Sequence, residues 1–131
     1  MKLGAIALCV DDMEKMVRFY RDLMRMELDY DGGGFTGVRT AEGIYFNLCE
    51  RELFESQLSR KFDYPGGLNG TMEITFNVPH FADVDLEYDR LMEAGVQSVY
   101  PPTTEPYGLR ICYIADPEGN LIEICSDGKG E

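Results

Sequence analysis

Two glutamates in this 131-residue chain stand where a carboxylate could do chemistry. Glu123 lies inside the apolar run 121–125, where a charge is costly unless it is hydrated, paired or bound to a metal ion. Glu73 opens the run 73–78, which alternates polar and apolar residues as a strand with one wet face does. Each residue fits either a hydrated or locally paired carboxylate, or a site residue acting as ligand, base or hydrogen-bond acceptor. Both are therefore candidate catalytic residues.

Other reactive side chains are few. The four cysteines (Cys9, Cys49, Cys112 and Cys125) form no CxxC pair and lie in strand-like runs, which favours reduced thiols in a cytoplasmic protein. The single histidine, His80, follows Pro79 in a loop-like segment, so no imidazole is expected to activate a thiol. Histidine-rich zinc or nickel chemistry is disfavoured for the same reason. The sequence contains no GxGxxG, phosphate-loop, GxSxG or zinc-finger motif.

The alternation of side chains along strands assigns these candidates to faces. One face of each run carries polar or cavity-lining residues: Tyr45, Asn47 and Cys49; Glu73, Thr75 and Asn77; Leu121, Glu123 and Cys125. The opposite faces are apolar: Ile44, Phe46 and Leu48; Ile74, Phe76 and Val78; Ile122 and Ile124. We expect the apolar sets to pack under helices.

The elements that position these residues occur twice. With an offset of 68, residues 5–28 align with residues 73–96 and share five identities: Ile6/Ile74, Val10/Val78, Tyr20/Tyr88, Leu23/Leu91 and Met24/Met92. Each copy begins with a short apolar run followed by a helical pattern. Asp11 or Asp12 is expected to cap the first helix, whereas Asp83 and Gly95 mark the start and the end of the second.

Three strands are expected to close each copy. In the first copy they are Glu27–Tyr30, Phe35–Thr40 and Ile44–Cys49, with a turn at Gly32–Gly34. In the second they are Val96–Tyr100, Leu109–Ala115 and Asn120–Ser126, with a bend at Pro101-Pro102 and a turn at Asp116–Gly119. The chain is thus predicted to be one α+β domain of two βαβββ modules. We assign residues 1–50 and 71–126 to the modules, 51–70 to a linker that can hold a short helix, and 127–131 to a tail.

Composition narrows the partners. The net charge is −12, and a field of that sign repels phosphate backbones and anionic lipids. Nucleic acid and membrane surfaces are therefore not expected partners. The apolar run 3–10 is too short to span a bilayer and lacks the features of a signal peptide, so we expect a cytoplasmic location.

Two stretches resemble a known family. Residues 6–20, Ile-Ala-Leu-Cys-Val-Asp-Asp-Met-Glu-Lys-Met-Val-Arg-Phe-Tyr, are similar to the opening strand and helix of glyoxalase-like modules. Residues 116–124, Asp-Pro-Glu-Gly-Asn-Leu-Ile-Glu-Ile, resemble the ending common in the glyoxalase and bleomycin-resistance (vicinal oxygen chelate, VOC) superfamily. The resemblance implies two modules that enclose a cup, and a homodimer.

The resemblance also implies four metal-ligand positions, which here would be Ala5, Asn47, Glu73 and Glu123. Ala5 offers no donor, so the set is incomplete. The remaining oxygen donors suit a hard divalent ion such as Mg²⁺, Mn²⁺ or Ca²⁺. The candidate cofactor, if any is bound, is a divalent metal ion: Mg²⁺, Mn²⁺ or Ni²⁺. The cup is expected to hold a small molecule, with Tyr45, Thr75, Asn77, Tyr107 and Arg110 as pocket residues and Tyr113 near its mouth.

Three functions remain open at this point. The first is a binding protein of the bleomycin-resistance kind with an incomplete metal centre. The second is a divalent-metal-dependent lyase, isomerase or dioxygenase acting on a vicinal-oxygen substrate, with a glutamate moving the proton. The third is a module that serves a partner protein. Fold analogy alone does not choose between them.

Overall fold

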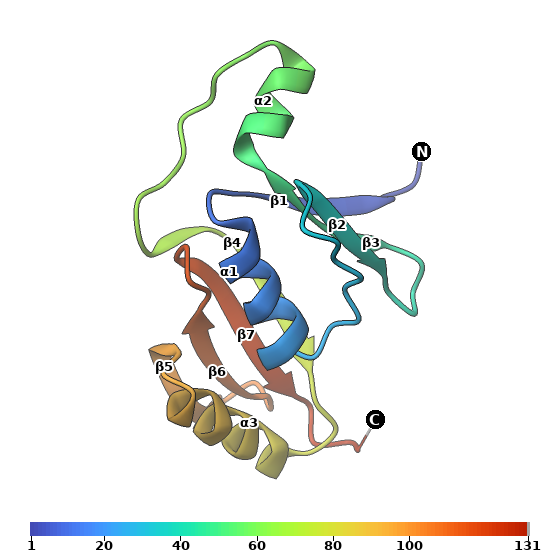
Figure 1. Cartoon of the computed structure of the whole chain (residues 1–131). Coiled ribbons are helices and arrows are strands. Elements are labelled where there is room, and N and C mark those ends of the chain that lie inside the picture. The colour runs from blue at the N-terminus through green and yellow to red at the C-terminus, as the bar shows by residue number, and fades with distance from the viewer. Residues whose placement is uncertain (131) are drawn as a thin grey trace. The chain divides into compact units, whose positions relative to one another are not determined.

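The computed structural model describes residues 1–130, so Glu131 of the predicted tail lies outside the described residues. The chain forms two compact units, Met1–Tyr64 and Pro65–Glu131, and each contains one of the predicted copies. Both combine helices with a β-sheet, as the α+β prediction requires (Figure 1). Within the described residues, no helix is both long and apolar enough to cross a membrane.

The first unit is a three-stranded sheet with the order β1-β3-β2, formed by β1 (Ala5–Val10), β2 (Phe35–Arg39) and β3 (Tyr45–Glu50). The first helix, α1 (Met13–Arg18), continues as a π-helical turn, η1 (Phe19–Leu23). Its cap is Asp12, whose carboxylate accepts from the Lys15 N–H at 3.1 Å, as one of the two predicted caps.

The core of the first unit forms where α1 and η1 pack on β3. Met16, Val17, Tyr20 and Leu48 are almost fully buried, and the rings of Tyr20 and Phe46 lie 5.1 Å apart. This confirms the helical pattern predicted after the first apolar run, and it confirms the burial of Phe46 and Leu48 on the predicted apolar face. Burying side chains of this size removes them from water at a gain of ~1.5–3 kcal/mol each, which holds the helix on the sheet.

The predicted strand Glu27–Tyr30 was wrong. These residues pair with no strand, and Arg25 just before them takes a left-handed backbone with φ of 61°. Leu28 is buried, but the Asp29 carbonyl accepts from the Thr36 hydroxyl at 3.0 Å rather than from a neighbouring backbone. A four-residue run with two exposed acidic side chains offers one apolar anchor, which is too little to hold a strand in register.

The segment predicted as a linker begins with a helix, α2 (Arg51–Leu58), which follows β3 directly (Figure 1). It contacts β1 and β3, and its end is stabilised by the tilted rings of Phe54 and Phe62, 5.4 Å apart. The short helix expected in this region is confirmed.

The second unit is a complete βαβββ module. Its strands β4 (Asn69–Asn77), β5 (Gln97–Thr104), β6 (Arg110–Ala115) and β7 (Asn120–Ser126) form a sheet of order β4-β7-β6-β5. The helix α3 (Phe81–Glu93) packs against β5, β6 and β7 (Figure 1). Ile122 and Ile124 of β7 are buried. The apolar face predicted for the last strand is confirmed.

The turns of the second unit hold the sheet in register. The Asp116 carboxylate accepts from the Glu118 and Asn120 N–H groups at 2.9 and 3.0 Å, which fixes the predicted turn before β7. The bend expected at Pro101-Pro102 does not end its strand. Instead β5 runs through both prolines with register shifts, as an edge strand can, because the missing N–H groups need no partner there.

Candidate functional site

A hydrogen-bonded network joins three strands on one face of the second unit. The Tyr113 hydroxyl donates to Glu73 Oε2 at 2.8 Å and lies 3.3 Å from Glu123 Oε2. The Thr75 hydroxyl donates to Glu123 Oε1 at 2.8 Å. The two candidate glutamates are thus linked through one phenol, and each carboxylate is supported by a neutral donor.

The strand register produces this network. Glu123 on β7 lies opposite Thr75 on β4 and opposite Tyr113 on β6, so it stands between the two hydroxyls. Its neighbours Ile122 and Ile124 point to the opposite face and are buried under α3. The alternation along β7 therefore places one carboxylate on the face that the helix leaves uncovered.

A hollow of about 560 Å³ adjoins the network on this face. Strands β4 to β7 and the turn between β5 and β6 supply its walls. They are lined by Glu73, Val99, Tyr100, Glu105, Tyr107, Ile111, Tyr113 and Leu121. Its size is in the range of sites for small organic ligands.

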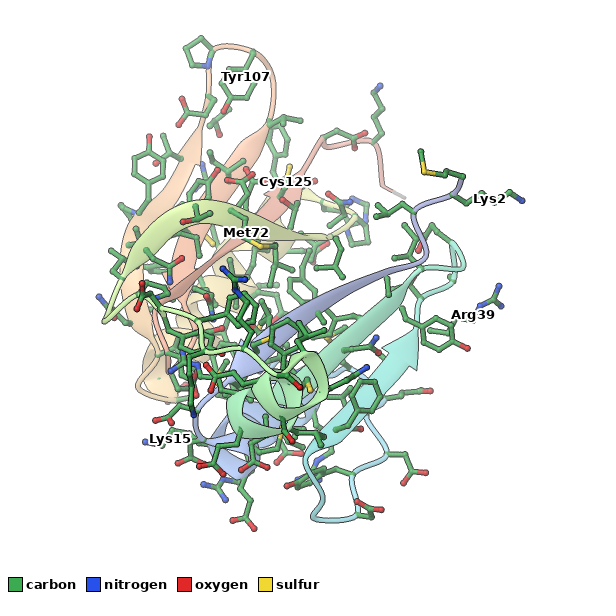
Figure 2. All side chains as sticks on the ribbon, turned by 90° about the horizontal axis from the view of Figure 1, so that it is seen from above. Lys2, Lys15, Arg39, Met72, Tyr107 and Cys125 are labelled. Carbon is green, nitrogen blue, oxygen red and sulfur yellow. The ribbon has the colours of Figure 1, made fainter. Side chains whose placement is uncertain are left out.

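Tyrosine residues supply both aromatic rings and polar hydroxyl groups to this hollow. The rings of Tyr100 and Tyr113 lie 6.3 Å apart at an interplanar angle of 62°. The Tyr100 hydroxyl donates to Glu105 Oε1 at 2.7 Å, which parallels the bond from Tyr113 to Glu73. Tyr107 stands on the turn between β5 and β6 and is 68% exposed (Figure 2).

The electrostatic field of the hollow is negative. Burial raises the pKa of the Tyr113 hydroxyl above its usual value, and the hydrogen bond to Glu73 and the charge of Glu123 raise it further. Partial desolvation by neighbouring groups, followed by the charges of Glu105 and Glu123, also raises the pKa of the exposed Tyr107. Both phenols are therefore protonated donors at neutral pH.

Two predicted pocket residues of the second unit lie elsewhere. The Arg110 guanidinium turns to the face covered by α3, where it forms a bidentate pair with Asp85 at 2.7 Å for each bond. It also donates to the Thr104 hydroxyl at 2.9 Å. Asn77 lines a separate hollow of about 420 Å³ with Val78, Leu109, Cys125 and Asp127.

The predicted residues of the first unit occupy matching positions in its sheet. Ala5 lies opposite Tyr45 on β3, as Glu73 lies opposite Leu121 on β7. Asn47 follows Tyr45 by two residues, as Glu123 follows Leu121, so the correspondence implied by the repeat holds in the strand register. The Asn47 side chain lies over Gly37 of β2, where an added Cβ would collide with it.

Sequence reasoning missed Val99, Tyr100, Glu105 and Ile111 as lining residues. Glu105 lies in the turn after β5, and Tyr100 precedes the two prolines of that strand. Ile111 shares the parity of Tyr113 along β6, so alternation alone could have placed it on this face. The pairing of Tyr100 with Glu105 depends on the bulged course of β5, which the sequence does not display.

The donor set does not fit a four-ligand metal centre. Ala5 carries no donor atom, and Glu73 and Glu123 are hydrogen-bonded to Tyr113 and Thr75. Among residues 1–130, no three His, Cys, Asp or Glu side chains gather as a metal site would require.

Another hollow, of about 470 Å³, lies beside α2 in the first unit. It is lined by the polar or charged residues Glu52, Glu55, Ser56, Ser59, Arg60 and Lys61. Glu55 in its wall accepts from the Phe62 N–H at 2.9 Å and from the Tyr64 hydroxyl at 3.1 Å. Through these bonds the Glu55 carboxylate holds the chain segment that follows α2. We assign no function to this hollow.

Comparisons with known proteins bear on both units. The model of the Glyoxalase/Bleomycin resistance protein/Dioxygenase superfamily matches residues 2–124. The chain is 31% identical over 127 residues to the uncharacterized protein YraH of Bacillus subtilis, which covers 95% of this chain and 97% of that relative. It is 28% identical over 120 residues to a probable lactoylglutathione lyase of Synechocystis, which covers 88% of this chain and 87% of the relative.

Solved structures share the fold. A glyoxalase-related enzyme from Fulvimarina pelagi superposes with a TM-score of 0.81 at 22% identity, over 95% of this chain and 87% of the other. Lactoylglutathione lyase from Agrobacterium tumefaciens superposes with a TM-score of 0.72 at 20% identity, over 95% and 92% of the two chains. At these identities the likeness establishes the fold and not the reaction.

Proposed function

Because this chain belongs to the glyoxalase/bleomycin resistance protein/dioxygenase superfamily, we propose that it binds a small organic molecule at the hollow of its second unit. The observation that carries the proposal is the junction of that hollow with the Glu73–Tyr113–Glu123 network. Apolar walls with a few convergent polar groups are the usual composition of a ligand site.

The apolar and the polar residues of the hollow recognise different parts of a ligand. Val99, Ile111 and Leu121 offer apolar surface, which favours the hydrocarbon part of a ligand. Tyr113 and the carboxylates it joins offer a hydroxyl and acceptor oxygens at fixed positions, which select the orientation of a polar group. The incomplete donor set makes binding without a resident metal the first candidate.

A fragment screen by two-dimensional NMR tests this proposal. Small aromatic and aliphatic compounds of positive, neutral and negative charge are titrated into the labelled protein. We expect shifts at backbone amides around Tyr100, Tyr107 and Tyr113, and we expect Tyr107→Ala to weaken binding. The matched control is Leu86→Ala, which truncates an exposed side chain of α3 on the other side of the sheet. A screen in which no compound of any charge shifts these amides refutes the proposal.

The predicted cup between the two modules forms a separate part of the proposal. It assigns Tyr45 and Asn47 of the first unit to the same ligand as the second unit. Tyr45→Ala measures this extension, because the Tyr45 side chain is exposed and its removal leaves the second unit intact. A loss of affinity supports a shared cup, whereas unchanged affinity confines the site to the second unit.

A second candidate function is a lyase, isomerase or dioxygenase acting on a vicinal-oxygen substrate. The observation that favours it is the placement of two carboxylates beside one phenol, since a positioned carboxylate can accept a proton and a neutral hydroxyl can donate one. The relative from Synechocystis bears the name of probable lactoylglutathione lyase. In this reading Glu123 and Glu73 are the candidate catalytic groups.

Turnover assays distinguish the two functions. Hemithioacetal turnover is measured alone and with added Mg²⁺, Mn²⁺ or Ni²⁺, and metal binding is followed separately by calorimetry. Stoichiometric binding that Glu123→Gln abolishes, together with metal-dependent turnover, favours the enzyme. Absence of both at millimolar ion leaves the binding function as the proposal.

Assembly and location remain proposals as well. We propose a homodimer, on the basis of the family resemblance and of the edge strands β1, β2, β4 and β5, and a cytoplasmic location, on the basis of the four free cysteines. Light scattering after size-exclusion chromatography decides between one and two copies.

A further inference from the structure

We infer that the hollow of the second unit selects organic cations: ligands with an ammonium or a similar positive group on an apolar body. This inference rests on the proposed function and adds the chemical class of the ligand. It follows from the charges, the rings and the apolar surface that line one hollow.

The first observation is the charge of the residues that line the hollow. Glu73 and Glu105 line the hollow, and Glu123 approaches it through the Tyr113 hydroxyl. Its described lining residues include no lysine, arginine or histidine. The nearest basic residue along β6, Arg110, is held by Asp85 on the helix-covered face. A cation entering the hollow therefore meets carboxylates without a competing basic side chain.

The aromatic rings add a second attraction. Tyr100 and Tyr113 form a corner with their centroids 6.3 Å apart, and Tyr107 stands at the same hollow. A cation within about 6 Å of a ring centroid is attracted to the face of the ring. Because the hydroxyls of Tyr100 and Tyr113 donate to Glu105 and Glu73, these rings are more electron-rich than free phenols, which strengthens the attraction.

The apolar surface determines the rest of the ligand. Val99, Ile111 and Leu121 lie in the wall of the same hollow, so a bare metal ion or a fully hydrated ion would leave this surface unused. An anionic ligand is disfavoured for the opposite reason, since a carboxylate or phosphate would lose its hydration opposite like charges. A planar or branched hydrocarbon carrying one positive charge uses both kinds of wall.

Three isosteric probes test the inference by calorimetry or NMR titration. They are benzyltrimethylammonium, its neutral analogue neopentylbenzene, in which carbon replaces the charged nitrogen, and the anion phenylmethanesulfonate. We expect the cation to bind at least about ten-fold more tightly than the neutral probe, with weaker binding at higher salt. The anion is expected not to bind.

Charge-removing variants localise the effect. Glu105→Gln keeps an acceptor oxygen for Tyr100 and removes one charge, so we expect about a three- to ten-fold loss for the cation and no change for the neutral probe. The control, Glu93→Gln, removes an equal charge from an exposed position of α3 and is expected to leave both affinities unchanged. Tyr107→Leu keeps apolar bulk and should also weaken the cation selectively.

The outcomes separate this inference from the proposed function. Equal binding of the cation and the neutral probe, unaffected by Glu105→Gln, overturns the cation selectivity and leaves the hollow as a binding site. Preference for the anion overturns it in the same way. If no compound of any charge shifts the amides around the hollow, the proposed function fails and the inference fails with it.

Discussion

Removing the Tyr113 hydroxyl is the most direct perturbation of the candidate site. In Tyr113→Phe the ring stays in place, but Glu73 and Glu123 lose the donor that they share. The two acceptor oxygens lie 2.8 and 3.3 Å from that hydroxyl, so they are no more than about 6 Å from one another. The substitution leaves two carboxylates at close range without the proton between them.

The energetic cost comes from the lost hydrogen bond, because the phenol is neutral and the repulsion between the two carboxylates is present in both proteins. Glu73 is exposed and Tyr113 is half-buried, so solvent weakens the contribution of this bond. A lost hydrogen bond to a charged group costs ~1.5–3 kcal/mol when buried and less here. We expect the free energy of unfolding to fall by ~1–1.5 kcal/mol at neutral pH.

The pH dependence gives this prediction a sign. The pKa of Tyr113 in the folded protein is raised, first by burial and then by the bond to Glu73. A tyrosine in the unfolded chain ionises near pH ~10. A group whose folded pKa is raised contributes stability fully below its unfolded pKa and loses it as the pH rises. The advantage of the unsubstituted protein over Tyr113→Phe should therefore shrink above pH ~10.

Urea unfolding followed by circular dichroism, at about pH 8 and about pH 11, measures this difference. Tyr107→Phe is the matched control at about pH 8, because Tyr107 is exposed and removal of its hydroxyl should leave the free energy of unfolding unchanged. The reasoning is refuted if Tyr113→Phe is as stable as the unsubstituted protein at neutral pH. It is refuted equally if the difference between the two proteins widens as the pH rises.

Three further predictions address the frame around the site. Arg110→Met breaks the bidentate pair with Asp85 and should cost ~1 kcal/mol, discounted for exposure. The Arg110 guanidinium lowers the pKa of Asp85, so that stability is present above pH ~4 and lost as the pH falls, and urea unfolding of the variant should show a flatter acid limb. Burial raises the pKa of Cys112 to about 12, so mass spectrometry after native alkylation at about pH 8 should find this thiol unmodified, and rapid labelling would contradict its burial. Gly119 has a φ of 89°, and a Cβ added there would collide with the backbone of Gly67, so Gly119→Ala should lower the free energy of unfolding by more than ~1 kcal/mol. The control is Gly66→Ala, whose Cβ meets open space and should change the free energy of unfolding by less than ~0.5 kcal/mol. Equal effects of the two substitutions in thermal unfolding would refute this account.

Alternation along single strands made much of the second unit predictable. The pattern around Glu123 separates one carboxylate from Ile122 and Ile124, and the structure buries the two isoleucines as expected. The same rule places Arg110 and Tyr113 on opposite faces of β6. Two residues lie between them, and residues of one strand share a face only when an odd number of residues lies between them. Arg110 shares the parity of Cys112, which is fully buried on the helix side.

The parts that sequence reasoning missed depend on contacts distant in the chain. The bond from Tyr113 to Glu73 spans forty residues and requires the register of β4, β7 and β6 together. The absence of the expected strand at Glu27–Tyr30 likewise involves a distant residue, Thr36, whose hydroxyl donates to the Asp29 carbonyl. Local propensity does not encode either contact, because each depends on the tertiary surroundings of the residues and not on their immediate sequence neighbours.

The duplicated frame also shows why chemistry is sought in one unit. Gly37 lies opposite Asn47 in the first sheet, in the place that Tyr113 takes opposite Glu123 in the second. Any Cβ at Gly37 would collide with the Asn47 amide, so the first sheet cannot place a phenol there without moving that side chain. One framework thus carries an amide over a glycine in the first unit and two carboxylates on a shared hydroxyl in the second. The asymmetry concentrates charge, aromatic surface and a ligand-sized hollow on the second sheet, which is where a gain or loss of function should be measured first.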